Sequence, residues 1–377
     1  MFSLGKKLLR FGASFLFFCS LLSPIAKAVI FYSTSDPAFN TTAPSGPLAG
    51  SGWQWVGFWG SFQGTVIDAH HFLTANHVGG SIGDTFTYQG FNYTTVNSFT
   101  DSASDLRIWE VRESFPSWAP LYRTSDEVGR ILIVFGRGIT RGAEMRTTVE
   151  VEGVPADSLA GWHWGPFDGK LRWGLNRIAG TVKRNSFGEQ LGAVFPPAKD
   201  SNLCHLGVND SGAPVFVNDG TSWKLAGIAG LVDGGFSTTE AGARTNAFVF
   251  DARGLFVNGK LKTGPRPIPS SFYATRISVR LNWINGILSA PLTATVTLSN
   301  LNQIYDGIPH PVTVSTNPAG LTYSITYNGA ATAPVNAGTY AIVTTVTSSG
   351  YAGSATGTLT ISKTPQTTNS STPPARP

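Results

Sequence analysis

The segment Gly207–Phe216 reads Gly-Val-Asn-Asp-Ser-Gly-Ala-Pro-Val-Phe and carries the most information about this chain. A serine hydroxyl is a weak nucleophile unless a neighbouring base removes its proton, so Ser211 requires a histidine from elsewhere in the chain. An Asp-Ser-Gly triplet is also an ordinary turn sequence when it stands alone. The interpretation of Ser211 therefore depends on two other segments.

The first of these segments is Phe72–Val78, which reads Phe-Leu-Thr-Ala-Asn-His-Val. A neutral imidazole can accept a proton from a serine and return it to a leaving amine. The chain has six histidines, and His70 and His71 lie close to His77. By itself, His77 therefore fits an ordinary structural histidine better than a general base.

The second segment is Ser104–Val111, in which Asp105 stands at the head of an alternating apolar strand. A carboxylate in such a place can hold an imidazole in one tautomer and stabilise its cation. An aspartate that caps the strand or forms a turn is the alternative. Asp101 is a rival acid four residues earlier, but no apolar strand follows it directly.

Together the three segments resemble the motifs of the chymotrypsin-like (trypsin-like) serine peptidases. Thr-Ala-x-His selects His77, and Gly207–Phe216 is similar to the family's Gly-Asp-Ser-Gly-Gly-Pro. The chain order His, Asp, Ser separates this family from subtilisins and α/β-hydrolases. The resemblance runs from about Trp53 to Leu288 and implies a catalytic triad of His77, Asp105 and Ser211. It extends to two later segments, which are similar to the family's substrate-binding strand (Leu225–Gly230) and to its closing strand and terminal helix (Phe272–Ile277 with Trp283-Ile284).

The resemblance also assigns roles around the serine. The backbone N–H groups of Asn209 and Ser211 are expected to form the oxyanion hole, and Asp210 is expected to be a buried acid. Asn209 replaces a glycine of the family, but asparagine tolerates a positive φ better than most residues. No Ile-Val-Gly-Gly activation sequence is recognisable, so we expect no zymogen cleavage and an internal partner for Asp210.

Substrate contacts are expected from His205, at the base of the specificity pocket, and from Gly230 and Leu231. A trypsin-like preference needs a carboxylate at the base of that pocket, so His205 argues against it. A space-filling role for His205 is an equal alternative.

The pattern along the chain predicts an all-β fold. Short β-rich segments such as Arg130–Phe135 and Val215–Val217 alternate with Gly, Asn, Pro and Asp. One helix is expected over Ile277–Leu288, where four apolar residues form a single stripe. The resemblance implies a chymotrypsin-like double β-barrel with a C-terminal helix, spanning residues 29–289.

A second, small β-sandwich-like domain is predicted for residues 290–362. From Leu292 the composition shifts to Thr, Val, Ala, Gly and Ser, with period-two alternation in Leu321–Tyr327 and Tyr340–Val346. This part resembles the MBG domain of bacterial surface proteins, which implies an extracellular spacer or adhesive module that contacts a cell-surface component. The matching segments are Tyr305–Gly307, Pro311–Pro318, Asn336–Tyr340 and Gly357–Ile361. Residues 363–377 have no apolar residue to bury and are predicted to be disordered.

The N-terminus reads as a signal peptide: three basic residues precede the apolar run Phe11–Leu22, and Ala26-Lys27-Ala28 follows. We expect cleavage after Ala28 and a secreted protein that is periplasmic, cell-surface or extracellular, with no membrane span after cleavage. A lipoprotein anchor on Cys19 is disfavoured by the bulky Phe17-Phe18 before it.

Removal of this segment changes the bulk properties of the chain. Residues 1–28 hold four Lys and Arg and no acidic residue, so their loss lowers the formal net charge from +5 to +1. A nearly neutral chain without a basic run argues against a nucleic-acid partner. Cys204 then remains alone, which excludes an intramolecular disulfide.

Two classes of function are therefore open. The first is a secreted serine endopeptidase that acts on protein or peptide substrates through an acyl-enzyme. The second is a catalytically inactive, peptidase-like protein for binding or adhesion at the cell surface. No metal or organic cofactor is expected, because the His, Cys and acidic residues lack ligand spacing.

Overall fold

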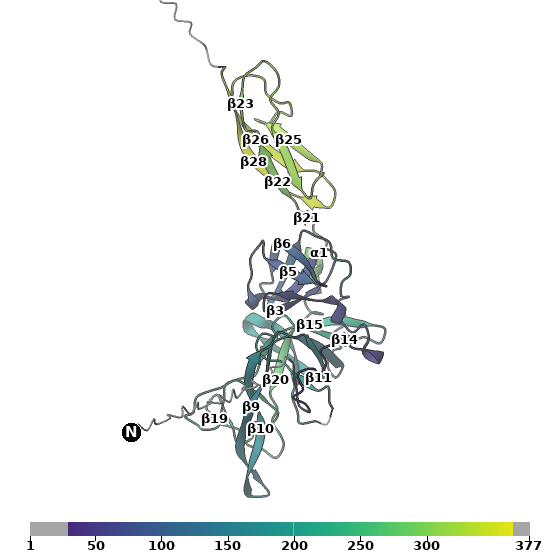
Figure 1. Cartoon of the computed structure of the whole chain (residues 1–377), viewed down its shortest axis with the longest axis vertical. Helices are drawn as coiled ribbons and strands as arrows, with labels where there is room; N and C mark the ends of the chain where they lie inside the picture. The colour runs from purple at the N-terminus through teal and green to yellow at the C-terminus, as the bar shows by residue number, and fades with distance from the viewer. Residues whose placement is uncertain (1–28, 199, 365–377) are drawn as a thin grey trace, which may run out of the picture.

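A computed structural model describes residues 29–198 and 200–364 of the chain (Figure 1). The signal peptide predicted for residues 1–28 and most of the predicted tail lie outside these residues. None of the helices that the structure describes has the length and apolar character needed to cross a membrane. The described chain is predominantly β-structure, as the alternating pattern predicts.

The first barrel is a closed, antiparallel sheet in the order β2-β3-β4-β7-β6-β5. Its interior holds large aromatic side chains, and the rings of Phe72 and Phe86 stack with centroids 3.9 Å apart. Gly57 makes room for this pair, since a Cβ there would lie 2.1 Å from Phe86 Cζ. The strands are β2 (Val56–Trp59), β3 (Phe62–Val66), β4 (His71–Ala75), β5 (Thr85–Tyr88), β6 (Phe91–Thr100) and β7 (Leu106–Val111).

The second barrel is also closed and has the order β11-β12-β20-β15-β14-β8. Its interior is mostly aliphatic and includes the lone described cysteine, Cys204, which is buried. The strands are β8 (Ile131–Gly136), β11 (Arg172–Arg184), β12 (Gly188–Val194), β14 (Pro214–Asn218), β15 (Trp223–Val232) and β20 (Ser271–Arg276). The two strands predicted from short apolar runs thus appear as β8 and β14.

One apolar cluster joins the two barrels and the helix. It contains Leu73 and Ile108 of the first barrel, Phe135 and Ile228 of the second, and Ile284 of α1 (Leu281–Leu288). Burial of a shared core fixes the barrels against each other, which matters because the site lies between them.

The helix is shorter than predicted, because it begins at Leu281 and not at Ile277. Residues 277–280 form a turn instead, in which the Arg280 amide donates to the Ile277 carbonyl. The Ser278 hydroxyl in this turn donates to Glu127 Oε1 at 2.6 Å. Long-range polar contacts of this kind are invisible to a periodicity argument and outweigh local helix propensity.

A three-stranded sheet, β17-β10-β9, lies outside both barrels, and its hairpin extends away from the second barrel in Figure 1. The strands are β9 (Ile139–Val151), β10 (Val154–Phe167) and β17 (Ala247–Val249). Two smaller sheets complete this side: β1 (Ile30–Phe31) pairs with β13 (Cys204–His205), and β16 (Phe236–Ser237), β18 (Phe256–Val257) and β19 (Lys260–Leu261) form the other. Of these three sheets, only the three-stranded one contributes a residue to the candidate site, Trp164 of β10.

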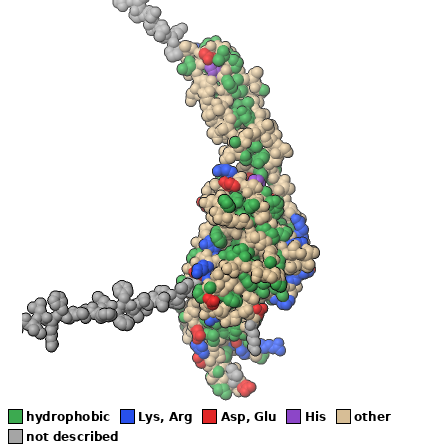
Figure 2. Space-filling view, turned by 45° about the vertical axis from the view of Figure 1, so that its right-hand side comes forward, with side chains coloured by type: hydrophobic (Ala, Val, Ile, Leu, Met, Phe, Trp, Pro, Cys, Tyr) green, Lys and Arg blue, Asp and Glu red, His purple; other side chains and the backbone are tan. Residues whose placement is uncertain are grey.

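The C-terminal module forms its own core beyond the barrels (Figure 1). In β26 (Gly338–Val346), Ile342, Thr344 and Val346 alternate between exposed neighbours, as the period-two pattern predicts. Figure 2 shows few charged side chains on the visible face of this module. The other strands are β21 (Leu292–Thr293), β22 (Thr295–Ser299), β23 (Asn302–Ile304), β24 (Thr313–Asn317), β25 (Tyr323–Tyr327), β27 (Tyr351–Ala352) and β28 (Ser354–Ser362).

A buried carboxylate fastens the module to the first barrel. Glu110 of β7 accepts the Thr293 amide at 2.6 Å and the Thr293 hydroxyl at 2.8 Å. The Asn97 side-chain amide donates to the same hydroxyl at 3.0 Å. Hydrogen bonds to a buried charged group are stronger than neutral ones, so the first residues of the module are held on the barrel.

We expect Glu110→Gln to loosen this junction, because the new amide group places a donor against the Thr293 amide. The loss is about 1–3 kcal/mol, and it should raise hydrogen exchange and proteolysis at residues 289–295. Glu113→Gln is the matched control, since Glu113 accepts the Thr94 amide at 2.7 Å within the first barrel. Equal exchange at the junction in both variants would contradict the assigned role of Glu110.

Candidate active site

The register of two strands places His77 beside Asp105. Ala75 at the end of β4 lies opposite Leu106 at the start of β7, and the Asn76 amide donates to the Asp105 carbonyl at 2.9 Å. The chain then turns through a 3₁₀ helix, Asn76–Val78. His77 Nδ1 lies 2.6 Å from Asp105 Oδ2, and the His77 amide donates to Asp105 Oδ1 at 3.0 Å.

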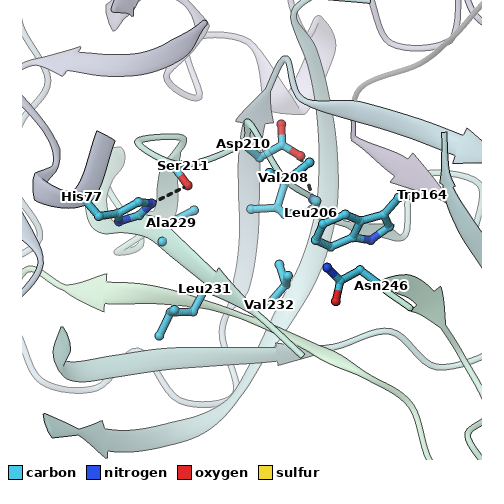
Figure 3. Close-up of a pocket in the computed structure, with 12 residues that line it drawn as sticks. His77, Trp164, Leu206, Val208, Asp210, Ser211, Ala229, Leu231, Val232 and Asn246 are labelled. Atoms are coloured by element: carbon cyan, nitrogen blue, oxygen red, sulfur yellow. Dashed lines mark hydrogen bonds between the residues drawn. The ribbon is translucent and has the colours of Figure 1, made fainter. Parts of the chain in front are cut away.

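Ser211 reaches the same point from the second barrel, on the loop before β14. Its Oγ lies 2.8 Å from His77 Nε2 (Figure 3). The next residue, Gly212, has φ +81°, and a Cβ there would lie 2.1 Å from the Gln63 carbonyl oxygen. Glycine is thus required for the loop to approach the first barrel so closely.

The three side chains form one directed chain of hydrogen bonds. The Asp105 side chain is 5% exposed and acceptor-only when ionised, so it fixes the proton of His77 on Nδ1. The Nε2 lone pair is then available to the Ser211 hydroxyl. The His77 side chain is 38% exposed, so the array is open to an incoming molecule at the serine end.

Gly230 of β15 lines the cavity, and the absence of a side chain at this position is also needed for the arrangement of His77 and Asp105. A Cβ at Gly230 would come 2.9 Å from Asp105 Oδ2 and 3.5 Å from His77 Cε1. Its absence lets the strand pass directly beside the imidazole. The prediction for Gly230 concerned substrate contact alone and missed this supporting role.

Asp101, the rival acid, has a different set of partners. It is buried and pairs with Arg280, whose Nε and Nη2 donate at 2.6 and 2.5 Å. The Ser104 hydroxyl also donates to Asp101 at 2.5 Å. Asp101 therefore ties the loop before Asp105 to the start of α1, and does not contact His77.

The loop before Ser211 has a left-handed backbone conformation at Asn209, the position where the similar family has glycine. Asn209 adopts φ +67°, in the left-handed region that asparagine tolerates. Within the described residues, the backbone amides of Asn209 and Ser211 donate to no protein acceptor. The neighbouring amides of Asp210 and Gly212 do donate, to the carbonyls of Gly207 and Ala229. The N–H groups of Asn209 and Ser211 are thus available to bind an acceptor beside the serine hydroxyl.

Asp210 lines the cavity, but the residue is 1% exposed and its carboxylate is bound by backbone amides. Oδ1 accepts the Gly138 amide at 2.7 Å, and Oδ2 accepts the Gly207 amide at 2.9 Å. Burial raises the pKa of this carboxyl to about 7, and the two backbone hydrogen bonds oppose that effect. Val29 is packed nearby, since a Cβ at Gly136 would meet both Asp210 Oδ1 at 2.3 Å and Val29 Cγ2 at 3.0 Å.

A cavity of about 300 Å³ opens beside the serine. Leu231, one of the expected substrate contacts, lines it together with Gly230. The rest of the lining comes from both barrels and from the outer sheet: His77, Trp164, Leu206, Gly207, Val208, Asp210, Ser211, Ala229, Val232 and Asn246.

His205, expected at the base of this pocket, does not line it. Its side chain is 1% exposed and packs edge-on against Phe195, Phe248 and Phe272. Nδ1 donates to the Leu206 carbonyl at 2.5 Å, and burial lowers the pKa of His205 to about 4. The neighbouring Leu206 lines the cavity instead, because successive side chains of an extended chain point to opposite sides.

Five lining residues were not singled out from the sequence: Trp164, Leu206, Val208, Val232 and Asn246. Leu206 directly precedes the segment Gly207–Phe216, Val208 lies within it without an assigned role, and Val232 continues the strand that contains Gly230 and Leu231. Trp164 and Asn246 come from the outer sheet and its neighbouring loop. No local motif marks them, because their position depends on the pairing of β10 with β17.

Comparison with known families assigns the C-terminal module. Residues 294–365 match the MBG domain, so this part of the chain is of the type found in bacterial surface proteins. The match covers less than half of the chain and describes this module alone. No curated protein matches the chain.

Proposed function

We propose that the two-barrel part of this protein is a serine endopeptidase of the chymotrypsin-like type. The observation that carries the proposal is the array Asp105–His77–Ser211, with the imidazole nitrogens 2.6 Å from the acid and 2.8 Å from the hydroxyl. The support also includes two closed six-stranded barrels with the array between them, and the chain order of the three residues.

The geometry supports the following reaction. Ser211 Oγ attacks the scissile carbonyl carbon while its proton passes to His77 Nε2, and the carbonyl oxygen becomes an oxyanion. The amides of Asn209 and Ser211 are the donors for that oxyanion. His77 then transfers the proton to the leaving amine, and an acyl-enzyme remains. Water, deprotonated by His77, attacks the acyl carbon and releases the acid and the free serine.

A fluorophosphonate probe tests this proposal without knowledge of the substrate, because it reacts with activated serines. We expect one adduct per chain, placed on Ser211 by peptide mass spectrometry. A folded protein that stays unlabelled would overturn the proposal and favour a binding or adhesion protein built on the same fold.

The proposal places this peptidase outside the cytoplasm. The signal sequence predicted for residues 1–28 directs export, and the MBG module is of a kind used at bacterial surfaces. The module is then a stalk that positions the peptidase near the cell surface. The Glu110–Thr293 contact sets the orientation of the module on the first barrel. Deletion of residues 292–377 should leave peptide cleavage intact, because none of the triad or cavity residues lies there.

Signal-peptide cleavage would also offer a charged partner to Asp210. Cleavage after Ala28 makes Val29 the first residue, and Val29 is 1% exposed and packed beside Asp210. A new α-amino group there would stabilise the ionised carboxylate. The expectation of no zymogen cleavage is unchanged, because removal of the signal peptide alone would expose Val29. The amine would add to the internal partners of Asp210, the Gly138 and Gly207 amides.

The pH dependence of stability tests this pairing. With Val29 in peptide linkage, burial raises the pKa of Asp210 to about 7 from 3.8, and a chain beginning at Lys27 keeps that linkage. The folded state then holds a proton that the unfolded chain releases, so the free energy of unfolding falls by up to about 4 kcal/mol across that window. A chain beginning at Val29 should show a much smaller fall.

Denaturant unfolding of the two chains at pH 4, 5.5 and 7 provides the measurement. His205 is common to both chains, so its own titration cancels in the difference. Parallel stability curves for the two chains would show that the Val29 amine does not reach Asp210.

A further inference from the structure

The cavity beside Ser211 has a mostly apolar lining. Figure 3 shows it bounded by His77 and Ser211 on one side and by Trp164 and Asn246 on the other. Leu206, which is buried, and Val208 lie above it in this view, and Leu231 and Val232 rise from below. A substrate side chain next to the scissile bond would enter this space.

Neither ionisable lining residue offers a charge to that side chain. His77 is committed to Asp105 and Ser211 at the mouth of the cavity. The Asp210 carboxylate is held by the amides of Gly138 and Gly207. Asp233, next to Val232, is also engaged elsewhere, since it accepts the Ser271 amide at 2.9 Å and the Tyr273 hydroxyl at 3.0 Å.

Two side chains limit the size of what can enter. Trp164 forms the far wall and is itself backed by Phe248, with ring centroids 6.2 Å apart. Val232 projects from β15 into the space between Ser211 and Asn246 in Figure 3. A β-branched side chain is restricted at χ1, so Val232 cannot easily swing aside.

We propose that the cavity selects an aliphatic side chain, such as that of Val or Leu, on the residue before the scissile bond, with Val232 as the residue that limits its size. This inference rests on the proposed peptidase function for its place in the reaction. A Lys, Arg, Asp or Glu side chain is excluded because it would be desolvated without a partner.

The first test is cleavage of a peptide library that varies only the residue before the scissile bond. We expect kcat/KM for Val and Leu to exceed that for Lys, Arg, Asp and Glu by about 100-fold or more, in line with what buried, unpaired polar groups cost a specificity pocket. A preference for a charged residue would overturn the inference while leaving the peptidase proposal intact. A preference for Asn or Gln would also overturn it, and would point to the Asn246 amide as the selecting group.

The second test removes the limiting side chain. Val232→Gly should raise kcat/KM for Phe and Tyr relative to Val by about 10–100-fold, the range that a small change of pocket volume produces. Val182→Gly, at a half-exposed position of β11 away from the cavity, is the matched control and should keep the original preference. An unchanged preference in folded Val232→Gly would remove Val232 from the proposed role.

A binding measurement keeps the inference testable if hydrolysis is absent. Peptides ending in Val, Phe, Lys or Glu can be titrated calorimetrically into the Ser211→Ala variant. We expect the Val-terminated peptide to bind at least about tenfold tighter than the Lys- and Glu-terminated ones. If the Val-terminated peptide binds more tightly but the wild-type protein is not labelled by the fluorophosphonate, the pocket preference is retained and the peptidase proposal is rejected. Equal binding of all four peptides would reject the pocket preference.

Discussion

Replacing Ser211 by alanine should lower kcat/KM for peptide hydrolysis by about 10⁶-fold, and His77→Ala should cost about as much. The two side chains act as one unit through the 2.8 Å contact between His77 Nε2 and Ser211 Oγ. The double variant should therefore be no slower than either single variant. This lack of additivity separates a shared catalytic role from two independent structural defects.

The measurement is the rate of peptide hydrolysis together with fluorophosphonate labelling, on variants whose thermal unfolding matches the wild type. Ser222→Ala, at an exposed position, and His70→Ala, whose Nδ1 contacts the Glu113 carbonyl, serve as controls. Both should keep wild-type rates. Hydrolysis that survives in Ser211→Ala would mean that another group is the nucleophile.

Asp105→Asn should lower kcat by about 10⁴-fold with little change in KM, because the substrate does not contact this residue. The asparagine can still accept the His77 amide, but its own NH₂ group would face Nδ1. That contact favours the tautomer with the proton on Nε2, which cannot accept the proton of Ser211.

Asp101→Asn is the informative comparison, because Asp101 was the competing acid in the sequence. Its loss leaves Arg280, 24% exposed, without its buried partner, and should destabilise the fold by about 3–5 kcal/mol. The kcat of the folded fraction should fall far less than in Asp105→Asn. An equal fall in kcat for both variants would contradict the assignment of Asp105.

The three residues of the candidate site could be picked out from the sequence. The residues around Ser211, His77 and Asp105 each carry a short motif, and alternation in β26 follows directly from its pattern of apolar residues. The MBG module was also predicted, at residues 290–362, and the family match covers 294–365. Each of these features depends on consecutive residues of the chain, so it can be detected from a short segment of the sequence.

The size and lining of the pocket could not be predicted in this way. His205 and Leu206 are adjacent in the chain, yet the backbone direction places only Leu206 in the cavity. Trp164 and Asn246 meet there because β10 pairs with β17, which are far apart in the sequence. The position of Val29 beside Asp210 likewise depends on the pairing of β1 with β13.

The sequence by itself determined which residues are candidates for catalysis, their order along the chain, and the all-β class. Only the tertiary structure decided that Asp105 and not Asp101 faces His77, and that the helix begins at Leu281. The physical reason is that strand register and buried ion pairs are long-range: the Asp101–Arg280 contact joins residues 179 positions apart. Such contacts stabilise the folded state only after the barrels have closed, so no local pattern encodes them.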